Sequence, residues 1–191
     1  MNELLDYLKK DNSISSEIEN KLNGIITEKL LVKGELVLTD NSIKKEHIFV
    51  ARGCLRSFYK TEDGKEYTLQ FAIKNWWISD YITLYTDDKS IVSIESLTHS
   101  KILVLDKNQV DTLYNEYPPF EAFQRKNFEK RTATLQKRIL SLLTLSAADK
   151  YNKFIQDYAD FEKIIPNYQI ASYLGITPQS LSRIRKESIK N

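Results

Sequence analysis

The side chains best suited to a chemical task lie between Pro166 and Asn191, where polar and basic residues alternate with apolar ones at helical spacing. In the DNA major groove, Gln can form two hydrogen bonds with adenine, and Arg can form two with guanine. Lys, Tyr and the hydroxyl residues suit phosphate oxygens. The segment therefore indicates a surface that reads DNA. The residues predicted to form this surface are Tyr168, Gln169, Thr177, Pro178, Gln179, Ser180, Ser182, Arg183, Arg185 and Lys186.

Two short helices must position these side chains. The first is expected over roughly 168–174, and Gly175 then supplies a turn. The second begins after Thr177, whose hydroxyl can cap it, with Pro178 at the first helical position, where a missing N–H costs little. The residues expected to face inward are Ile170, Ala171, Leu174, Leu181 and Ile184. This pattern is typical of a helix-turn-helix, whose second helix enters the major groove.

Position and expected exposure agree best for Gln179, Ser180 and Arg183, which we predict to contact bases. The predicted phosphate contacts are Tyr168, Gln169, Arg185, Lys186 and Lys190. The sequence given ends at Asn191, soon after this helix, so we expect the β-hairpin wing that usually follows to be incomplete. The simpler alternative is a capped helical hairpin with solvated charges.

The formal net charge of the 191-residue chain is only +2, so any positive charge that attracts nucleic acid must be concentrated locally. Lys and Arg are indeed dense over 125–138 and again over 183–190. No secretory signal opens the sequence, and no apolar run is long enough to cross a bilayer. These features predict a cytoplasmic protein with no membrane partner.

The chain has only one cysteine and two histidines, which argues against catalysis or metal binding by these residues. One cysteine, Cys54, excludes an internal disulfide and a thiolate-held cluster, and its β-like setting favours a buried structural thiol. His47 and His99 stand alone, and we expect both to be solvated. No nucleophile–base set, Gly-rich phosphate loop or metal-ligand spacing is present. The sequence therefore predicts no enzyme, no metal and no cofactor.

The N-terminal part of the chain changes character near residue 25. Residues 1–24 show helical periodicity, with Ser13 and Ser15 as expected caps. Short β-rich runs then follow up to Leu105, and Asp63-Gly64 between two of them is a hairpin signal. Many short strands separated by turns predict a sandwich or barrel.

A helical period returns after Asp106. A short helix is expected over 107–117, and a long one over 120–143 beyond the Pro118-Pro119 pair. Apolar residues recur at intervals of four and three along the long helix, which is typical of a coiled-coil seam. Packing against its own domain is the alternative interpretation. The predicted dimer contacts are Phe128, Leu135, Ile139 and Leu142.

The order of these parts resembles the Crp/Fnr superfamily of bacterial transcription regulators. The likeness is strongest in IASYLGITPQSLSRIRK and in the preceding AADKYNKFIQDYADFEKIIP, and it extends in outline to GCLRSFYKTEDGKEYTLQF. It implies an α+β fold with three parts. These are a jelly-roll, cyclic-nucleotide-binding-like sensor domain over 1–117, a dimerisation helix over 118–143, and a helix-turn-helix domain over 144–191 that lacks a complete wing.

The nucleotide cassette of that superfamily has a Gly-Glu pair, followed about ten residues later by an Arg that neutralises the cyclic phosphate. Here Ser79-Asp80 stands at the pair and Ser90 at the Arg position, with Lys89 beside it. A flexible lysine out of register replaces a guanidinium poorly. We therefore expect a degenerate ligand pocket at these four residues and no cyclic AMP binding.

The resemblance implies a homodimer that binds double-stranded DNA, with RNA polymerase and an unidentified small-molecule effector as candidate partners. A second interpretation is a ligand-sensing or protein-interaction module whose degenerate helix-turn-helix does not bind DNA. The adjacent Trp76 and Trp77 are expected to serve core or dimer packing, and an aromatic wall for a ligand is the alternative.

Overall fold

The computed structural model describes residues 3–9 and 14–188, which divide into two compact units. The first unit comprises Met1–Tyr59 and Gln70–Gln124, and the second comprises Lys60–Leu69 and Arg125–Asn191. A hairpin tip in the middle of the sequence thus groups with the C-terminal helices. Ser13, an expected cap, lies outside the described residues.

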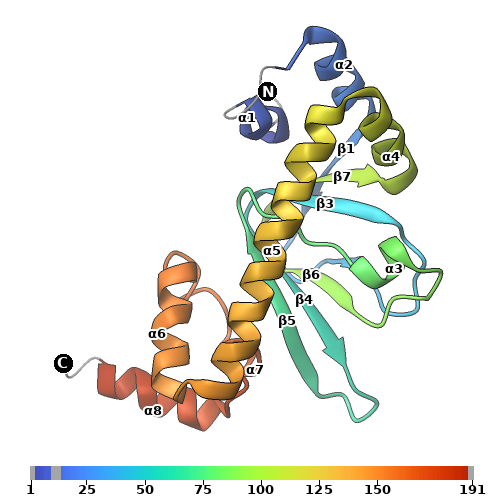
Figure 1. Ribbon diagram of the computed structural model, residues 1–191. Helices are drawn as coiled ribbons and strands as arrows, with labels where there is room; N and C mark the ends of the chain where they lie inside the picture. The colour runs from blue at the N-terminus through green and yellow to red at the C-terminus, as the bar shows by residue number, and fades with distance from the viewer. Residues whose placement is uncertain (1–2, 10–13, 189–191) are drawn as a thin grey trace. The chain divides into compact units, whose positions relative to one another are not determined.

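The first unit consists of two β-sheets and four helices, followed by the start of a long fifth helix (Figure 1). Its strands form one sheet of order β1-β7-β3 and another of order β2-β6-β4-β5. These two sheets match the expected arrangement of many short strands. The elements are α1 (Glu3–Lys9), α2 (Ser16–Ile25), β1 (Ile26–Leu31), β2 (Leu36–Leu38), β3 (Glu46–Arg52), β4 (Cys54–Lys60), β5 (Glu66–Ile73), α3 (Tyr81–Tyr85), β6 (Ser93–Ser96), β7 (Ser100–Asp106) and α4 (Lys107–Glu116).

The sheet β1-β7-β3 is apolar on both faces because successive side chains of a strand point in opposite directions. On β3, Ile48 and Val50 join an apolar cluster that draws residues from both sheets. Phe49 and Ala51 join a second cluster, which includes residues of α1, α2 and α4. The first cluster is the interior of the sandwich, and the second seals the outer face of this sheet under the helices.

Two turns of this β-region follow local chemistry. The expected Asp63-Gly64 turn is confirmed, since the Gly64 amide donates to the Thr61 carbonyl at 2.9 Å. Between β3 and β4, Gly53 has a φ of +95°, and a Cβ placed there would lie 2.2 Å from Ser100 Oγ. Only glycine fits that turn without displacing its neighbours.

The remaining helices are α5 (Pro118–Thr144), α6 (Ala147–Tyr158), α7 (Asn167–Leu174) and α8 (Pro178–Ser188). The long helix is confirmed, and the two prolines form its first turn, where their missing N–H groups cost little. Ser146 caps α6 by accepting from the Asp149 amide at 3.2 Å. In the second unit, buried aromatic residues of α6 pack with the apolar residues of α7 and α8.

Within residues 3–9 and 14–188, no helix combines the length and the apolar character that a membrane crossing requires.

Candidate nucleic-acid interface

The turn between α7 and α8 has the geometry that its sequence predicts. Gly175 ends α7 in the left-handed region with a φ of +65°, and the Ile176 amide reaches back to the Ala171 carbonyl at 3.0 Å. Thr177 Oγ1 accepts from the Ser180 amide at 3.1 Å, and Pro178 is the first residue of α8. The turn, the cap and the proline position are therefore confirmed.

The two faces of α8 differ in the way that the sequence indicates. The five expected inward residues of α7 and α8 are all buried. On the opposite face of α8, Gln179, Ser182, Arg183 and Lys186 are exposed, and with Pro178 they line a shallow depression of about 480 Å³. Thr177 is exposed as well, and Ser180 is half-buried and accepts a hydrogen bond from the Thr177 hydroxyl at 3.0 Å. Lys190 lies outside the described residues.

Gln169 does not have the exposure that a phosphate contact needs. Its side chain is buried, and its Nε2 donates to Tyr168 Oη at 3.3 Å. This burial does not favour a phosphate contact at Gln169, which stays a prediction. Tyr168, its neighbour, is exposed and keeps its predicted position at the surface.

Arg185 is also placed differently from the prediction. Its Nε donates to Tyr151 Oη at 3.0 Å, its Nη2 forms an ion pair with the Glu162 carboxylate, and its Nη1 donates to Asn167 Oδ1. These bonds commit the guanidinium to α6, to the segment before α7 and to α7 itself. This bonding does not favour a phosphate contact at Arg185, which stays a prediction.

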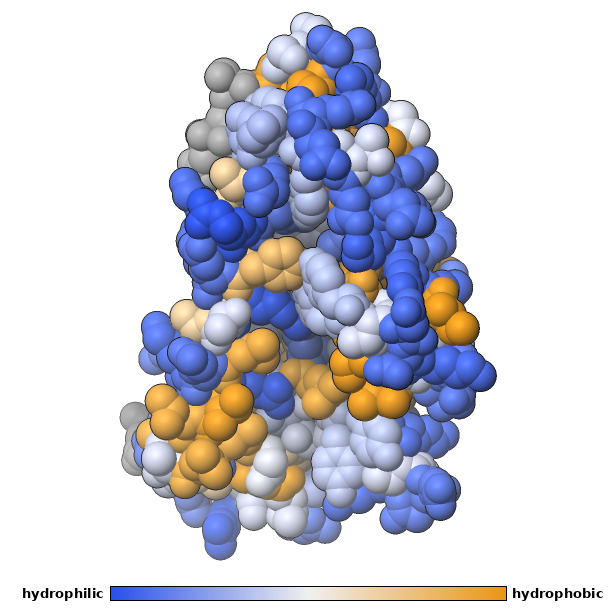
Figure 2. Space-filling view, turned by 45° about the vertical axis from the view of Figure 1, so that its right-hand side comes forward, coloured by the Kyte–Doolittle hydropathy of each residue, from blue (hydrophilic) through white to orange (hydrophobic). Residues whose placement is uncertain are grey.

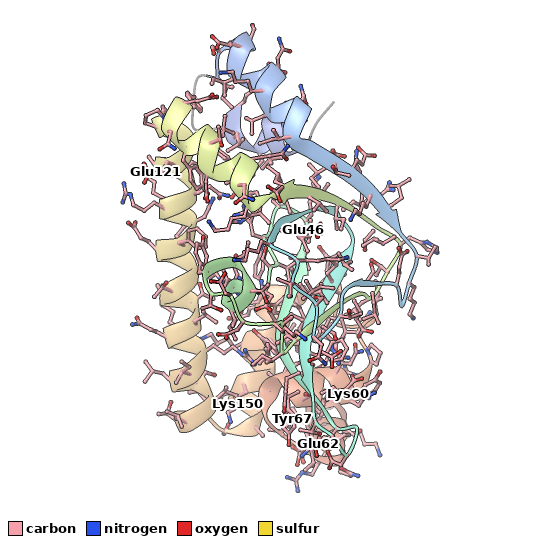
Figure 3. The ribbon with its side chains drawn as sticks, turned by 90° about the vertical axis from the view of Figure 1, so that its right-hand side faces the viewer. Glu46, Lys60, Glu62, Tyr67, Glu121 and Lys150 are labelled. Carbon is pink, nitrogen blue, oxygen red and sulfur yellow. The ribbon has the colours of Figure 1, made fainter. Side chains whose placement is uncertain are left out.

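The hairpin tip at residues 60–69 is bonded to α7, a relationship that sequence reasoning missed. Ser172 Oγ accepts from the Thr68 amide and donates to the Glu66 carbonyl, each at 2.9 Å. Figure 3 shows Lys60, Glu62 and Tyr67 of the hairpin at the end of the view where the C-terminal helices lie. No local pattern could have revealed these bonds, since Thr68 and Ser172 are 104 residues apart in sequence.

Arg138 of α5 reinforces the same junction. Its guanidinium donates to the carbonyls of Thr68 and Tyr173, both at 3.1 Å, and to the carbonyl of Leu69. The guanidinium carbon also lies over the Tyr173 ring, 4.2 Å from its centroid. In the sequence Arg138 is one of a dense group of basic residues; in the structure it has a specific internal role.

The predicted seam of α5 is largely at the surface of the second unit. Leu135, Ile139 and Leu142 are exposed, and Phe128 is half-buried. Further exposed apolar residues that the seam did not include are Leu140, Leu143 and Leu145. Figure 2 shows apolar side chains gathered at the surface in the lower part of the view. The end of α5 therefore presents more apolar surface than the periodic pattern predicts.

The residues predicted to form a degenerate ligand pocket make local bonds in the structure. Ser79 Oγ accepts from the Ile48 amide at 3.1 Å, and the Asp80 carboxylate caps α3 through the Ile82 amide at 3.0 Å and Thr83 Oγ1 at 2.7 Å. Ser90 Oγ donates to the Val92 carbonyl at 2.7 Å. These three residues are buried, whereas Lys89 is exposed. The acid and the hydroxyls are thus already occupied, and the lysine does not join them.

A buried guanidinium does occur in the first unit, at Arg56 on β4. It forms an ion pair with Glu95 on the neighbouring strand at 3.1 Å and lies over the Phe58 ring at 4.1 Å. The carboxylate neutralises this cation, so Arg56 does not offer the uncompensated charge that a cyclic phosphate needs.

His47 is buried, which corrects the expectation of a solvated side chain. Its ring lies edge-on to Trp77 with centroids 6.4 Å apart, and burial lowers its pKa to about 4. His99 is exposed as expected.

Cys54 is buried, and burial raises the pKa of its thiol to about 12, which confirms a structural thiol. Trp77 packs on Phe49 in the second apolar cluster, as core packing predicts.

Among the described residues, no group of His, Cys, Asp and Glu is arranged to hold a metal ion.

Comparison with known proteins shows which domain family and which solved structures the chain is similar to. Residues 28–117 match the model of the cyclic nucleotide-binding domain family. No curated protein matches the chain. The solved structure of FixK2 from Bradyrhizobium japonicum is similar over 87% of this chain and 85% of its own, with 14% identity and a TM-score of 0.74.

Two further solved structures have the same fold. CLP of Xanthomonas campestris, a global regulator responsive to c-di-GMP, is similar over 92% of both chains with 11% identity and a TM-score of 0.70. A protein from Eubacterium rectale assigned to the Crp/Fnr transcriptional regulators is similar over 96% of this chain and 87% of its own, with 15% identity and a TM-score of 0.71. Residues 28–117 are thus similar to the cyclic nucleotide-binding domain, and the chain has the same fold as these solved structures.

Proposed function

We propose that this protein is a homodimeric, DNA-binding transcription regulator of the Crp/Fnr type. The observation that carries the proposal is the exposed face of α8, where Gln179, Ser182, Arg183 and Lys186 stand opposite a buried apolar face. In this proposal α7 and α8 form a helix-turn-helix, and α8 lies in the major groove. Gln179 and Arg183 contact bases, Ser180 and Ser182 assist them, and Tyr168 and Lys186 contact phosphates.

The distribution of charge supports DNA as the partner. Residues 125–191 contain 13 Lys and Arg against six Asp and Glu, a formal net charge of +7. Residues 1–124 contain 15 Lys and Arg against 20 Asp and Glu. The part of the chain that carries α7 and α8 therefore attracts a polyanion, although the whole chain is nearly neutral.

The exposed apolar residues of α5 support dimerisation. An exposed apolar stripe on a long helix is usually covered by another helix. Apolar residues at intervals of three and four are the pattern with which two copies of a helix pair. We assign Phe128, Leu135, Ile139 and Leu142 to this seam. The proposed division is a jelly-roll sensor over 1–117, a dimerisation helix over 118–143 and a DNA-binding domain over 144–191. A symmetric dimer would bind half-sites about one helical turn apart.

We propose that the sensor domain does not respond to cyclic AMP. Ser90 occupies the place of the phosphate-binding Arg, and the Asp80 carboxylate is already bonded to the start of α3. Arg56, the buried guanidinium of this unit, is already paired with Glu95, so it would not neutralise a cyclic phosphate. The sensor therefore answers to another ligand, or its activity is set by abundance. A cytoplasmic location and a contact with RNA polymerase complete the proposal.

The test is a selection of duplexes from a random-sequence library with the full-length protein, followed by fluorescence anisotropy on a selected duplex at several salt concentrations. A regulator should enrich a pseudo-palindrome and bind it more tightly than scrambled DNA, with affinity falling steeply as salt rises. If no sequence is enriched and anisotropy detects no binding at low salt, the DNA-binding assignment is wrong. A ligand-sensing or interaction module with a degenerate helix-turn-helix would then be the better description.

A further inference from the structure

The arginine at position 185 is the centre of a polar cluster that joins three segments of the second unit. We call the cluster of Arg185, Tyr151, Glu162 and Asn167 the Arg185 clamp. Tyr151 Oη donates to the Glu162 carboxylate at 2.6 Å, and the Arg185 guanidinium bonds to both residues. Its Nη2 also donates to the Glu162 carbonyl at 3.3 Å, and its Nη1 to Asn167. Every nitrogen of the guanidinium thus has a partner on another element.

We propose that Arg185 is a positioning residue, which fixes the orientation of α8 so that Gln179 and Arg183 reach base edges. This inference rests on the proposed DNA-binding function. Arg185 itself touches no base or phosphate in this role. It acts by holding the helix that carries the reading residues.

The clamp adds directional bonds to the apolar contacts of α8. The buried face of the helix is formed by Leu181 and Ile184, and apolar contacts are not directional. The Arg185 guanidinium, in contrast, forms directional hydrogen bonds to three segments: α6, the segment at Glu162 and the first residue of α7. A small rotation of α8 would break these bonds, and it would also displace Gln179 and Arg183 together.

The position of the clamp separates Arg185 from its neighbours on the same helix. Arg183 and Lys186 are exposed on the outer face, whereas the Arg185 side chain is 24% exposed and its Glu162 partner 15%. A phosphate bond at Arg185 would require the guanidinium to leave Glu162 and Tyr151 and would leave a half-buried carboxylate unpaired. Holding α8 is therefore the role that the bonding geometry favours.

The two roles predict different salt dependences. Removing a phosphate contact lowers the magnitude of the slope of log affinity against log salt by about 0.9, whereas loss of a positioning bond leaves the slope unchanged. The experiment compares Arg185→Met with Lys186→Met and Arg183→Met on a duplex selected by the wild-type protein. Anisotropy is measured at several salt concentrations well below the melting temperature, which circular dichroism reports for each variant.

For Arg185→Met we expect affinity for the selected duplex to fall about tenfold or more, with the slope of the wild-type protein. Lys186→Met should flatten the slope, and Arg183→Met should reduce discrimination at one base pair. Tyr151→Phe removes a single hydroxyl of the clamp and should reproduce part of the Arg185→Met loss. Combining the two should cost less than the sum of their separate effects, because both break one network.

Several outcomes would overturn the inference. A flattened slope for Arg185→Met would make Arg185 a phosphate contact, and full affinity in both Arg185→Met and Tyr151→Phe would make the clamp irrelevant to reading. If Arg185→Met fails to fold, Tyr151→Phe and Glu162→Gln provide the same comparison. Absence of DNA binding by the wild-type protein would instead contradict the proposed function, so the two failures are distinguishable.

Discussion

Ser172 on α7 binds the backbone of Thr68 on β5, with the Thr68 amide donating to Ser172 Oγ at 2.9 Å. The same hydroxyl donates to the Glu66 carbonyl, so one side chain satisfies both a donor and an acceptor of the hairpin edge. The first residues of β5 therefore belong to the helical unit, and the strand then continues into the β-rich unit.

Replacing Ser172 by Ala removes both bonds and should lower the free energy of unfolding by about 1–3 kcal/mol. Urea denaturation followed by circular dichroism measures the change. Ser182→Ala is the matched control, because Ser182 is exposed on α8 and should alter stability by less than about 0.5 kcal/mol. Equal stabilities of the two variants would show that the hairpin contact adds nothing.

Substitutions on the outer face of α8 should separate base reading from phosphate binding. Arg183→Ala is expected to cost about 1–3 kcal/mol of binding free energy and to relax specificity at one base pair. Lys186→Ala should weaken binding to all sequences alike and flatten the salt slope by about one. Anisotropy with the selected duplex and its single-base variants measures both, and parental behaviour of both variants would refute these roles.

Cyclic AMP should give no saturable heat in calorimetric titration of the full-length protein. The physical reason is the serine at position 90, whose hydroxyl is bonded to the Val92 carbonyl and provides no positive charge. Inorganic phosphate serves as the control for nonspecific anion binding. A micromolar or tighter dissociation constant for cyclic AMP would contradict the prediction.

The burial of His47 predicts an acid-sensitive stability. Its pKa falls from 6.5 to about 4 on folding, so the unfolded chain binds the proton more readily between these values. Stability should therefore decrease as pH drops from about 6.5 toward 4, by about 2–4 kcal/mol from this residue. Asp111 and Asp106 oppose the shift of the pKa, and Lys107 supports it.

The measurement compares urea unfolding of the wild-type protein with that of His47→Gln across this pH range. The carboxylates titrate in both proteins, so the difference between the two curves isolates His47. His99→Gln is the control, because that side chain is exposed and should retain the wild-type pH dependence. A difference curve that is flat between pH 4 and 6.5 would mean that His47 is accessible to protons in the folded protein.

Ile139→Glu should weaken the proposed dimer by at least about tenfold, since it places an uncompensated carboxylate in an apolar seam. Sedimentation equilibrium gives the dissociation constant. Gln136→Glu adds the same charge at an exposed position of α5 outside the assigned seam and should retain most of the association. A dimer that tolerates glutamate at position 139 would place the interface elsewhere.

The features that the sequence predicts best are those fixed by neighbouring residues. Gly175, Thr177 and Pro178 determine the turn and the cap by local rules, and the inward residues of α7 and α8 follow from helical spacing. The two-sheet region follows likewise from short alternating runs. The long helix was placed within two residues because its limits are marked by Pro118 and by the change at Ser146.

The misplaced residues are those whose surroundings come from distant segments. Gln169 and Arg185 have polar side chains that suit a surface, but Gln169 is buried, and Tyr151 and Glu162 bind the Arg185 guanidinium. His47 is enclosed by Trp77 from a segment 30 residues away in the chain. Long-range partners of this kind leave no periodic pattern in a single sequence.

The sheet with apolar side chains on both faces has a consequence for folding. A one-residue slip of β3 against β7 would exchange Ile48 with Phe49 between the two clusters, yet it would still bury apolar groups on each side. Hydrophobicity alone therefore penalises such a misalignment weakly. Correct alignment depends instead on the bulge between Val50 and Arg52 and on the Gly53 turn against Ser100.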